Sequence, residues 1–346
     1  MSPMTVLRIA DLFSGIGGIR LGFENACKSL GVQCECVYSC DINKNAAKVY
    51  RSRFQDDHDP LGDITKVENF TTLPDVDVVL AGFPCVSFSI AGGKKGFDEA
   101  RGTLFFHLAK LIASKRPMAF LFENVDNLKR HDRGRTFRTI MNILTDDLNY
   151  GIHHAILNSK DFGVPQNRKR IYIVGFRNGG GGFVFPKPTD SSKRLSDIVE
   201  KEPVDPKYYL SQRYLDALNR HKDHHKGKGQ GFGYLIKKPT DVASTVLCGG
   251  MGKERNLLID TRTVVFSSRK TLVNSDHIRV MTPTEWERLQ GFPPEWTSGV
   301  PDGVRMDLLG NSVTVPVIEA ISLNIVKELR RDKPIPYCDQ HDPLFA

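Results

Sequence analysis

Two side chains that can do covalent and acid–base chemistry stand just after apolar runs of the sequence. Cys85 follows the run at 77–81 through a turn with glycine and proline, and Glu123 follows the run at 119–122. Short apolar runs of this kind predict buried parallel strands. Open α/β sheets carry functional residues just beyond the carboxyl ends of such strands. The spacing therefore favours a cysteine nucleophile near a carboxyl group, although a buried structural cysteine would also fit Cys85 taken alone.

Two arginines precede a further apolar run. Arg168 and Arg170 stand at alternate positions of the stretch 166–170, directly before the strand predicted at 171–175. Alternate residues of a strand point to the same side, so both guanidinium groups are expected there together. A salt-bridged surface strand would account for the same pattern.

A glycine-rich turn must position a ligand near these groups. The strand predicted at 7–13 runs into the turn 14–18, and a helix follows at 19–26. Strand, glycine turn and helix in this order are typical of the nucleotide-binding start of a doubly wound fold. Asp41 ends the second predicted strand, where such folds place the acid that binds ribose hydroxyl groups. Asp63 lies at the tip of a short turn, where a helix N-cap is the alternative interpretation.

The whole pattern predicts an α/β fold with a doubly wound, Rossmann-like sheet and a smaller second domain. Composition changes at 178–188, which contains four successive glycines and two prolines, and the pattern stays irregular, with short β segments, to about residue 276. We therefore expect a cofactor-binding catalytic domain at 1–185, completed by 277–335, and a smaller, mostly irregular and β domain at 186–276.

Composition narrows the class of protein. The 346 residues carry a net charge of +8, which favours a polyanionic partner, and cations concentrate at 213–228 beside several glycines. Seven cysteines make an odd number for a disulfide framework, so a reducing cytoplasm is expected. Cys34, Cys36 and Cys40 have no second cluster to complete a zinc site, so no metal is expected. No apolar run is long enough to span a bilayer, and a soluble, unprocessed protein is expected.

In the order of these motifs the chain resembles the prokaryotic DNA cytosine-C5 methyltransferases. The matching stretches span nearly the whole chain: 11–18, 82–85, 123–125, 166–170 and 310–313, with weaker matches at 62–64 and 279–292. Five motifs in the family's order make a merely structural role for Cys85 improbable. Val86 stands where the family commonly has glutamine, and Asp41 where it commonly has glutamate.

The resemblance implies covalent catalysis on a cytosine flipped out of the duplex. The Cys85 thiolate would add to ring C6, which makes C5 electron-rich. Glu123 in its acid form would protonate ring N3. Arg170, with Arg168 nearby, would hold ring O2 and the adjacent phosphate. A methyl group from S-adenosylmethionine would pass to C5, followed by loss of the C5 proton and expulsion of Cys85.

The resemblance also implies a cofactor pocket. Phe13 would lie against the adenine, Asp41 would bind the ribose hydroxyls and Asp63 the adenine amine. Residues 311–313 would close the pocket from the C-terminal side. The full set of expected cofactor-binding residues is Phe13, Ser14, Gly15, Gly17, Gly18, Asp41, Ile42, Asp63, Ile64, Asn311, Ser312 and Val313.

The region 186–276 matches the family's target-recognition domain in place and size. Two parts of it, 229–234 and 244–247, resemble members that methylate the inner cytosine of CCWGG. Gln230 is a candidate for filling the gap left by the flipped base, with an ordinary loop glutamine as the alternative. The loop 87–101 should close over the DNA and place lysines on phosphates. The residues expected to contact DNA are Ser89, Lys94, Lys95, Arg101, Gln230, Tyr234 and Thr245.

These expectations add up to a sequence-specific methyltransferase acting on double-stranded DNA. It would act as a monomer in the cytoplasm, as part of a restriction-modification or other phage-defence system. A tRNA substrate is the alternative within the family. A catalytically inactive DNA-binding regulator is a third hypothesis, but it predicts loss of the cysteine, the glutamate or the glycine turn, and all three are present.

Overall fold

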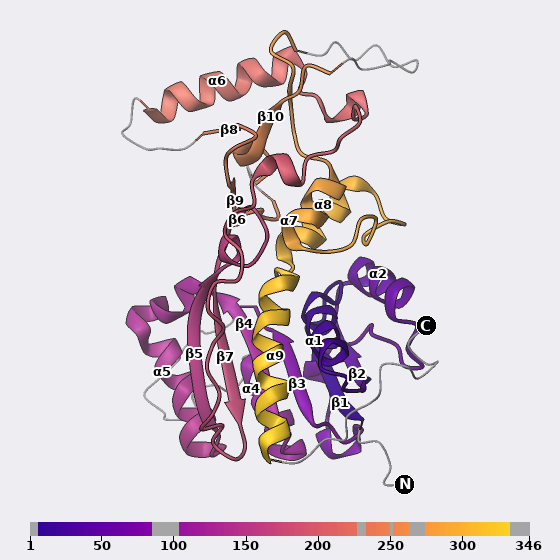
Figure 1. Ribbon diagram of the computed structural model, residues 1–346, viewed down its shortest axis with the longest axis vertical. Coiled ribbons are helices and arrows are strands. Elements are labelled where there is room, and N and C mark those ends of the chain that lie inside the picture. Colours follow the sequence, from indigo (N-terminus) through magenta and orange to yellow (C-terminus); the bar gives the residue numbers. More distant parts are fainter. Residues whose placement is uncertain (1–5, 85–103, 227–232, 250–251, 263–273, 333–346) are drawn as a thin grey trace. The chain divides into compact units, whose positions relative to one another are not determined.

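The computed structural model describes residues 6–84, 104–226, 233–249, 252–262 and 274–332. The chain forms two compact units (Figure 1). Unit 1 contains 1–158, 169–187 and 315–346, and unit 2 contains 159–168 and 188–314. This division differs from the predicted domain boundaries, because residues 277–314 pack with unit 2. The strand β11 (Ile278–Arg279) pairs there with β10 (Leu257–Ile259), which ties the start of this stretch to unit 2.

Unit 1 is built on a six-stranded sheet in the order β2-β1-β3-β4-β7-β5. The first four strands along the chain are parallel, whereas β7 runs antiparallel to both of its neighbours. Central strands such as β3 are buried over most of their length, as expected for apolar strands covered on both faces. The strands are β1 (Leu7–Leu12), β2 (Cys34–Cys40), β3 (Val78–Gly82), β4 (Ala119–Val125), β5 (Gly151–Asn158) and β7 (Lys169–Phe176). The predicted α/β sheet is thus confirmed.

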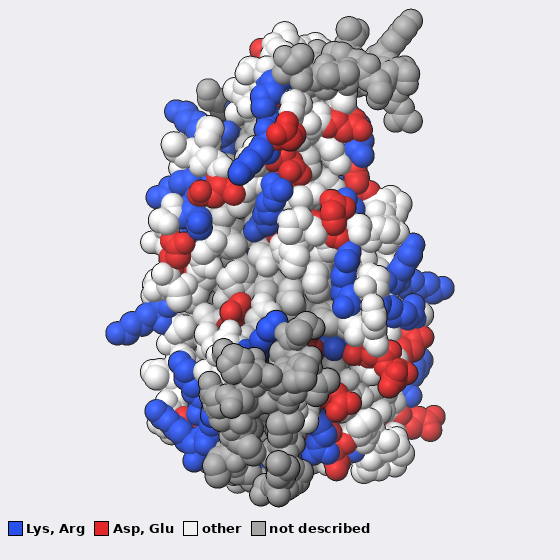
Figure 2. Space-filling model, turned by 45° about the vertical axis from the view of Figure 1, so that its right-hand side comes forward, with Lys and Arg blue, Asp and Glu red and all other residues white. Residues whose placement is uncertain are grey.

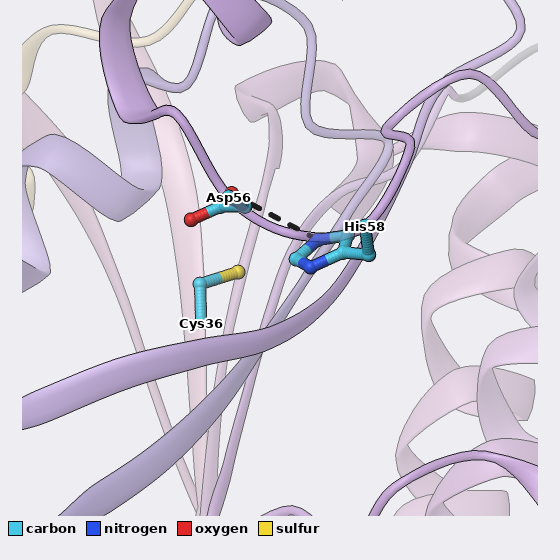
Figure 3. Close-up of side chains that lie close together, drawn as sticks. All are labelled: Cys36, Asp56 and His58. Atoms are coloured by element: carbon cyan, nitrogen blue, oxygen red, sulfur yellow. Dashed lines mark ion pairs between the residues drawn. The ribbon is translucent and has the colours of Figure 1, made fainter.

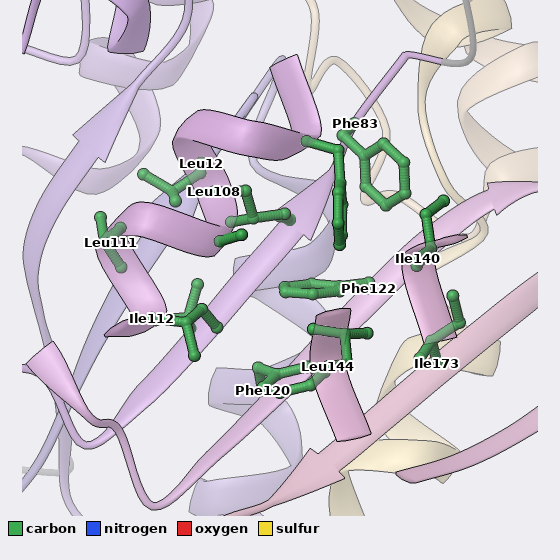
Figure 4. Packing of buried hydrophobic residues seen from close by; sticks show 14 of the residues in the cluster. Leu12, Phe83, Leu108, Leu111, Ile112, Phe120, Phe122, Ile140, Leu144 and Ile173 are labelled. Carbon is green, nitrogen blue, oxygen red and sulfur yellow. The ribbon is translucent and has the colours of Figure 1, made fainter. Parts of the chain in front are cut away.

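Helices cover the sheet of unit 1. They are α1 (Gly18–Ser29), α2 (Lys44–Phe54), α4 (Leu104–Lys115), α5 (Arg135–Asn142) and α9 (Val315–Asp332). Helices α4 and α5 pack on β1, β3, β4 and β7 to form the main apolar core, which includes Leu12, Phe120 and Phe122 (Figure 4). Figure 1 shows α9 lying along α1. Gly22 permits this approach, because a Cβ there would lie 2.7 Å from the Cβ of Ile318.

The described residues include one helical stretch, Asp302–Arg331, whose length and apolar composition would suffice to cross a membrane. Most of its apolar window is buried. The core helix of a soluble protein passes the same test, and the packing of α9 against α1 fits that interpretation.

Among its described residues, unit 2 combines short strands with three α-helices. Strand β6 (Gln166–Asn167) pairs with β9 (Ala243–Ser244), and β10 pairs with both β11 and β8 (Ile236–Lys237). Its helices are α6 (Gln212–Lys226), α7 (Pro283–Gln290) and α8 (Asp302–Asn311). The sequence pattern did not predict α6. Its apolar face is narrow, with Leu215 and Leu218 buried against Leu210, Leu257 and Ile278.

A buried ion-pair network joins three elements of unit 2. Arg279 is fully buried, and its guanidinium group lies 2.8 Å from carboxylate oxygens of both Asp260 and Glu285. Glu285 also forms a capping box with Thr282 at the start of α7. Because buried charges are stable only when paired, this network fixes β11 against α7.

Candidate active site

The sheet edge of unit 1 brings together two of the predicted catalytic residues. Glu123 lies at the carboxyl end of β4, and Arg170 lies at the start of the antiparallel strand β7. The Nε of Arg170 is 3.1 Å from Oε1 of Glu123, and both side chains are almost buried, at 11% and 12% exposure. A charge-assisted contact of this length fixes the orientation of both groups. Two residues that the sequence placed at the same sheet edge are therefore in direct contact, although the sequence did not predict this ion pair.

Asn124 anchors the chain that leads to Cys85. Its side chain is buried, and its Nδ2 donates a 2.7 Å hydrogen bond to the carbonyl oxygen of Phe83. The Phe83 ring packs against Phe105 and Phe122, with ring centroids 5.6 and 6.1 Å apart (Figure 4). The chain is thus held beside β4 up to the residues that precede the cysteine. Cys85 itself lies outside the described residues, as do Ser89, Lys94, Lys95 and Arg101.

The glycine turn after β1 is held by Asp41. One carboxylate oxygen of Asp41 accepts the amide of Gly15 at 2.8 Å, and the other accepts the amide of Asn43 at 2.7 Å. Phe13, Gly15 and Gly17 all have positive φ, at 52°, 54° and 82°. A Cβ at Gly15 would meet no atom within 4 Å, so the turn is open on that side. A Cβ at Gly17, in contrast, would collide with the Phe54 ring, which explains why glycine is needed there.

The remaining cofactor candidates of unit 1 differ in their exposure and in the groups that they can present to a ligand. The hydroxyl of Ser14 is buried and has no hydrogen-bond partner among the described residues. Ile42 is 73% exposed and presents an apolar face beside Asp41. Ile64 is buried in the core, so its side chain is not available to a ligand. Gly18 is the first residue of α1.

Asp63 has the N-cap role that the sequence left open. Its Oδ1 accepts hydrogen bonds from the amide and the hydroxyl of Thr65, at 2.9 and 2.7 Å. These hydrogen bonds lower the pKa of Asp63. A carboxylate can accept up to about four hydrogen bonds, so the N-cap role leaves capacity for a ligand amine.

These features fit an adenosine-type ligand. An open glycine turn, an unpartnered hydroxyl, two acceptor carboxylates and an exposed apolar side chain match the amino acid, ribose and purine parts of S-adenosylmethionine. The turn carries no basic residue, as expected for a cofactor without a pyrophosphate. Asn311, Ser312 and Val313 lie in unit 2.

A partly buried cluster of polar side chains lies in unit 1 (Figure 3). Cys36, Asp56 and His58 offer metal-ligand atoms that all lie within 4.8 Å of one another. Asp56, however, is paired with the Arg20 guanidinium, whose Nη2 is 2.9 Å from Oδ1. Burial raises the pKa of Cys36 to about 12, so the thiol stays protonated at neutral pH. A divalent cation would have to displace Arg20 from its carboxylate, and the cluster is better described as a support for the turn.

Arg20 connects this network to the first strand. Its guanidinium group lies 4.0 Å from the centre of the Phe54 ring, and its Nη1 donates to the Tyr50 hydroxyl at 3.2 Å. Tyr50 in turn donates to Asp11 at 3.2 Å, and burial raises the pKa of this fully buried carboxyl group. The start of the family motif therefore has a structural function, which sequence spacing alone did not indicate.

Arg168 does not share the position predicted for it beside Arg170. It is 2% exposed, it belongs to unit 2, and its guanidinium donates to the carbonyl oxygens of Val246, Gly310 and Ser312 at 2.9, 3.2 and 2.5 Å. Strand β6 ends before Arg168 and β7 begins after it. The strand alternation on which the prediction depended is interrupted there, which explains the difference.

Arg168 belongs to a buried network that holds two segments of unit 2 together. Gln166 accepts the amide of Val246 at 3.0 Å and donates to the carbonyl of Leu289 at 2.9 Å. The Cys248 thiol donates to Oδ1 of Asn311 at 2.9 Å. A Cβ at Gly310 would lie 2.5 Å from the amide nitrogen of Cys248, so only glycine fits. Segment 245–248 and segment 310–312 are thus adjacent, a contact that no local sequence pattern predicted.

Comparisons with known proteins identify the family. A family model described as "C-5 cytosine-specific DNA methylase" matches residues 7–327. The chain belongs to this family. The Type II methyltransferase M.HpaII from Haemophilus parainfluenzae is 46% identical over 326 residues, covering 92% of this chain and 89% of that protein. M1.ScrFI from Lactococcus lactis subsp. cremoris is 41% identical over 331 residues, covering 94% and 79%. The enzyme class expected from the sequence, a DNA cytosine-C5 methyltransferase, is therefore confirmed.

Solved structures support the fold of this DNA methylase. The Entamoeba histolytica methyltransferase EhMeth has a TM-score of 0.67 at 19% identity, covering 95% of this chain and 99% of that one. The S. pombe Dnmt2 methyltransferase has a TM-score of 0.64 at 20% identity, covering 94% and 99%. These likenesses concern the fold alone.

Two of the DNA-contact candidates of this methylase already have partners within unit 2. The hydroxyl of Thr245 donates to the carbonyl oxygen of Asn167 at 2.7 Å. The hydroxyl of Tyr234 donates to Asn219 on α6 at 2.7 Å, and Lys222 lies 4.7 Å from its ring centre. Tyr234 thus stabilises the position of α6 through these two contacts. Gln230 lies outside the described residues.

Helix α6 carries the cations that the sequence placed in this region. Arg213, Arg220 and Lys222 are exposed, whereas Leu215 and Leu218 are buried. Elsewhere on the protein, Lys and Arg side chains lie among Asp and Glu on the face shown in Figure 2. Helical spacing of the two leucines was the one signal that could have revealed this helix.

Proposed function

We propose that the protein transfers a methyl group from S-adenosylmethionine to C5 of a flipped-out cytosine in double-stranded DNA. The observation that supports this most is the contact between Glu123 and Arg170, beside the Asn124-anchored chain that leads to Cys85. With Cys85 following this anchored chain, the arrangement would bring a nucleophile, an acid and a cation to one sheet edge. Relatives such as M.HpaII are named Type II methyltransferases, and from this likeness we infer that the protein protects host DNA beside a nuclease or another phage-defence system.

The residues divide the chemistry between them. The Cys85 thiolate forms a bond to ring C6, while Glu123 donates a proton to ring N3, so that electron density moves to C5. Arg170 holds the ring O2 and orients Glu123 through the 3.1 Å contact. When bound, S-adenosylmethionine supplies an electrophilic methyl group to C5. Removal of the C5 proton by a base then breaks the bond between Cys85 and C6 and regenerates the thiolate, and the proton on ring N3 returns to Glu123.

The cofactor would be held mainly by the glycine turn of unit 1. Backbone groups at Gly15 and Gly17 would approach the amino acid part of the cofactor, and Asp41 would accept the ribose hydroxyls. Phe13 and Ile42 would cover the purine, and Asp63 would accept its amine. Ser14 offers an unpartnered hydroxyl. Asn311, Ser312 and Val313 remain candidates on unit 2.

Unit 2 would recognise the target sequence. The resemblance of 229–234 and 244–247 to CCWGG-specific members suggests the inner cytosine of CCWGG as the target. Bisulfite sequencing of DNA from cells that express the protein measures this directly. Methylation in another context would reassign the target and leave the transferase activity in place.

A tritium-transfer assay tests the activity. Purified protein with labelled cofactor should label duplex DNA and leave tRNA unlabelled, and absence of label in DNA would contradict the proposal. Replacing Cys85 by serine should abolish transfer and leave cofactor binding, measured by calorimetry, unchanged. As the matched control, Cys34→Ser changes a cysteine at the start of the edge strand β2 that has no proposed role in bond formation, and it should retain transfer.

A further inference from the structure

The segment that follows β4 carries an excess of positive charge that the proposed mechanism does not use. Residues 129–138 contain five cations and one acid, Asp132. All five side chains are exposed, and that of Arg130 is 78% exposed. The cations are Lys129, Arg130, Arg133, Arg135 and Arg138.

The backbone of this segment is held in an unusual conformation. Asp132, Arg133 and Gly134 have successive positive φ values of 48°, 55° and 81°. Residues with side chains seldom adopt this region, and they stay there only where the surroundings determine it. The anchor is Thr136, which is fully buried and whose hydroxyl lies 2.7 Å from Nδ1 of His131. The exposed cations therefore project from a fixed turn.

The segment begins at the sheet edge that carries the candidate catalytic pair. Val125, the last residue of β4, is aligned with Arg170 on β7. The short helical turn η3 (Asp126–Lys129) follows at once and leads into the basic residues. Segment and catalytic pair both belong to unit 1, so this placement does not depend on unit 2.

The acidic residues nearby neutralise only part of the charge. Asp126 lies 4.0 Å from Arg130, and Asp132 lies 2.6 Å from Arg135. Among the described residues, Arg133 and Arg138 have no carboxylate within ion-pair distance. Exposed ion pairs of this kind contribute little to stability, so folding does not explain the charge.

We propose that residues 129–138 bind backbone phosphates of the DNA duplex next to the target nucleotide. This inference rests on the proposed function and adds a phosphate-binding surface on unit 1 to the recognition expected from unit 2. The planar guanidinium group pairs with two phosphate oxygens at once, which suits an arginine-rich turn. Contacts of this kind position the duplex and carry no sequence information.

The test compares DNA affinity at several salt concentrations for the native protein and for R130Q/R133Q/R138Q. Fluorescence anisotropy with two duplexes, one with and one without the target sequence, gives the slope of log Kd against log salt. Each lost phosphate contact should make the slope shallower by about one, so a change of up to about three is expected. Both duplexes should be affected alike. Cofactor affinity, measured by calorimetry, and kcat at saturating DNA should stay within about twofold.

Two further variants make the result decisive. R130K/R133K/R138K keeps the charge and should retain most of the slope, whereas a folding defect would alter both variants. The control K28Q/R177Q/K327Q removes three exposed cations elsewhere on unit 1 and should leave the slope unchanged. An unchanged slope in the glutamine variant, or an equal change in the control, would overturn the inference. Failure of the native protein to label DNA would instead overturn the proposed function.

Discussion

Arg168 and Arg170 are separated by one residue, yet the protein uses them in different ways. Arg170 contacts a single carboxylate at a sheet edge of unit 1, and some of its side chain is exposed. Arg168 is buried in unit 2 and donates to three backbone carbonyls. A guanidinium that contacts carbonyls from distant segments holds a fold together. One that meets a carboxylate at an accessible edge can exchange that partner for a substrate.

The largest effect is expected from Arg168→Met. The change removes the donors of three buried carbonyl oxygens, and each unsatisfied acceptor costs about 1–3 kcal/mol. The free energy of unfolding of unit 2 should therefore fall by about 3 kcal/mol or more. Urea unfolding followed by tryptophan fluorescence reports on this unit selectively, because both tryptophans, Trp286 and Trp296, belong to it.

Arg168→Lys sharpens the same comparison. Lysine keeps the charge but lacks the planar fork, so it should recover only part of the lost stability. A midpoint for Arg168→Met equal to that of the native protein would show that the three carbonyl contacts are not stabilising.

Arg170→Gln should have the opposite effect, leaving stability unchanged and lowering activity. The unfolding midpoint should stay close to the native value, while kcat/KM for methyl transfer falls about 100-fold, typical of the loss of one well-placed electrostatic group. The matched control is Lys169→Gln, an exposed change next to it in the chain. Equal loss of activity in the control, or loss of stability in Arg170→Gln, would remove the distinction between the two arginines.

Acid should affect Asp260 of unit 2 and Asp11 of unit 1 differently, with the smallest effect of the three. Burial alone would raise the pKa of Asp260, but hydrogen bonds from Arg262 and Arg279 outweigh it and lower the pKa to about 2. The unfolded chain, with a pKa of about 3.9, takes up this proton first. The contribution of the ionised Asp260 to the free energy of unfolding is therefore complete above about pH 4 and is lost as the pH falls toward 2.

In unit 1, by contrast, burial raises the pKa of Asp11, so acidification to this range does not remove a contribution from that residue. Tryptophan fluorescence during acid titration should show unit 2 losing on the order of 1 kcal/mol of stability between pH 4 and 2. Asp260→Asn should flatten this part of the curve. If the stability of the variant fell with pH as steeply as that of the native protein, the loss could not be assigned to Asp260.

The sequence was sufficient for the sheet and for the edge that carries the site. The apolar runs at 77–81 and 119–122 became β3 and β4, and the glycine turn opened α1. These elements are predictable because local spacing and burial agree in them. Helix α6 was missed because two leucines on a strongly charged background give only a weak helical signal.

The roles of individual site residues were harder to predict. Glu123 and Arg170 are in contact because the register of β4 and β7 brings them together. The polar residues at the ends of these neighbouring strands lie at one edge of the sheet. Arg168 was misplaced because the alternation of the strand breaks between β6 and β7. The contact of Cys248 with Asn311 depends on chain segments more than 60 residues apart. Such contacts are fixed by tertiary packing, which local patterns do not contain.

The close packing of α1 against α9 at Gly22 has a consequence for how the chain is made. The glycine turn and its helix are synthesised first, but the helix that covers them emerges only after residues 188–314 have passed through the ribosome. At ordinary rates of synthesis this interval lasts on the order of ten seconds. During that time the apolar side of α1 lacks its partner helix, so a nascent chain should need shielding there. Translation thus delays completion of unit 1 until unit 2 has been made.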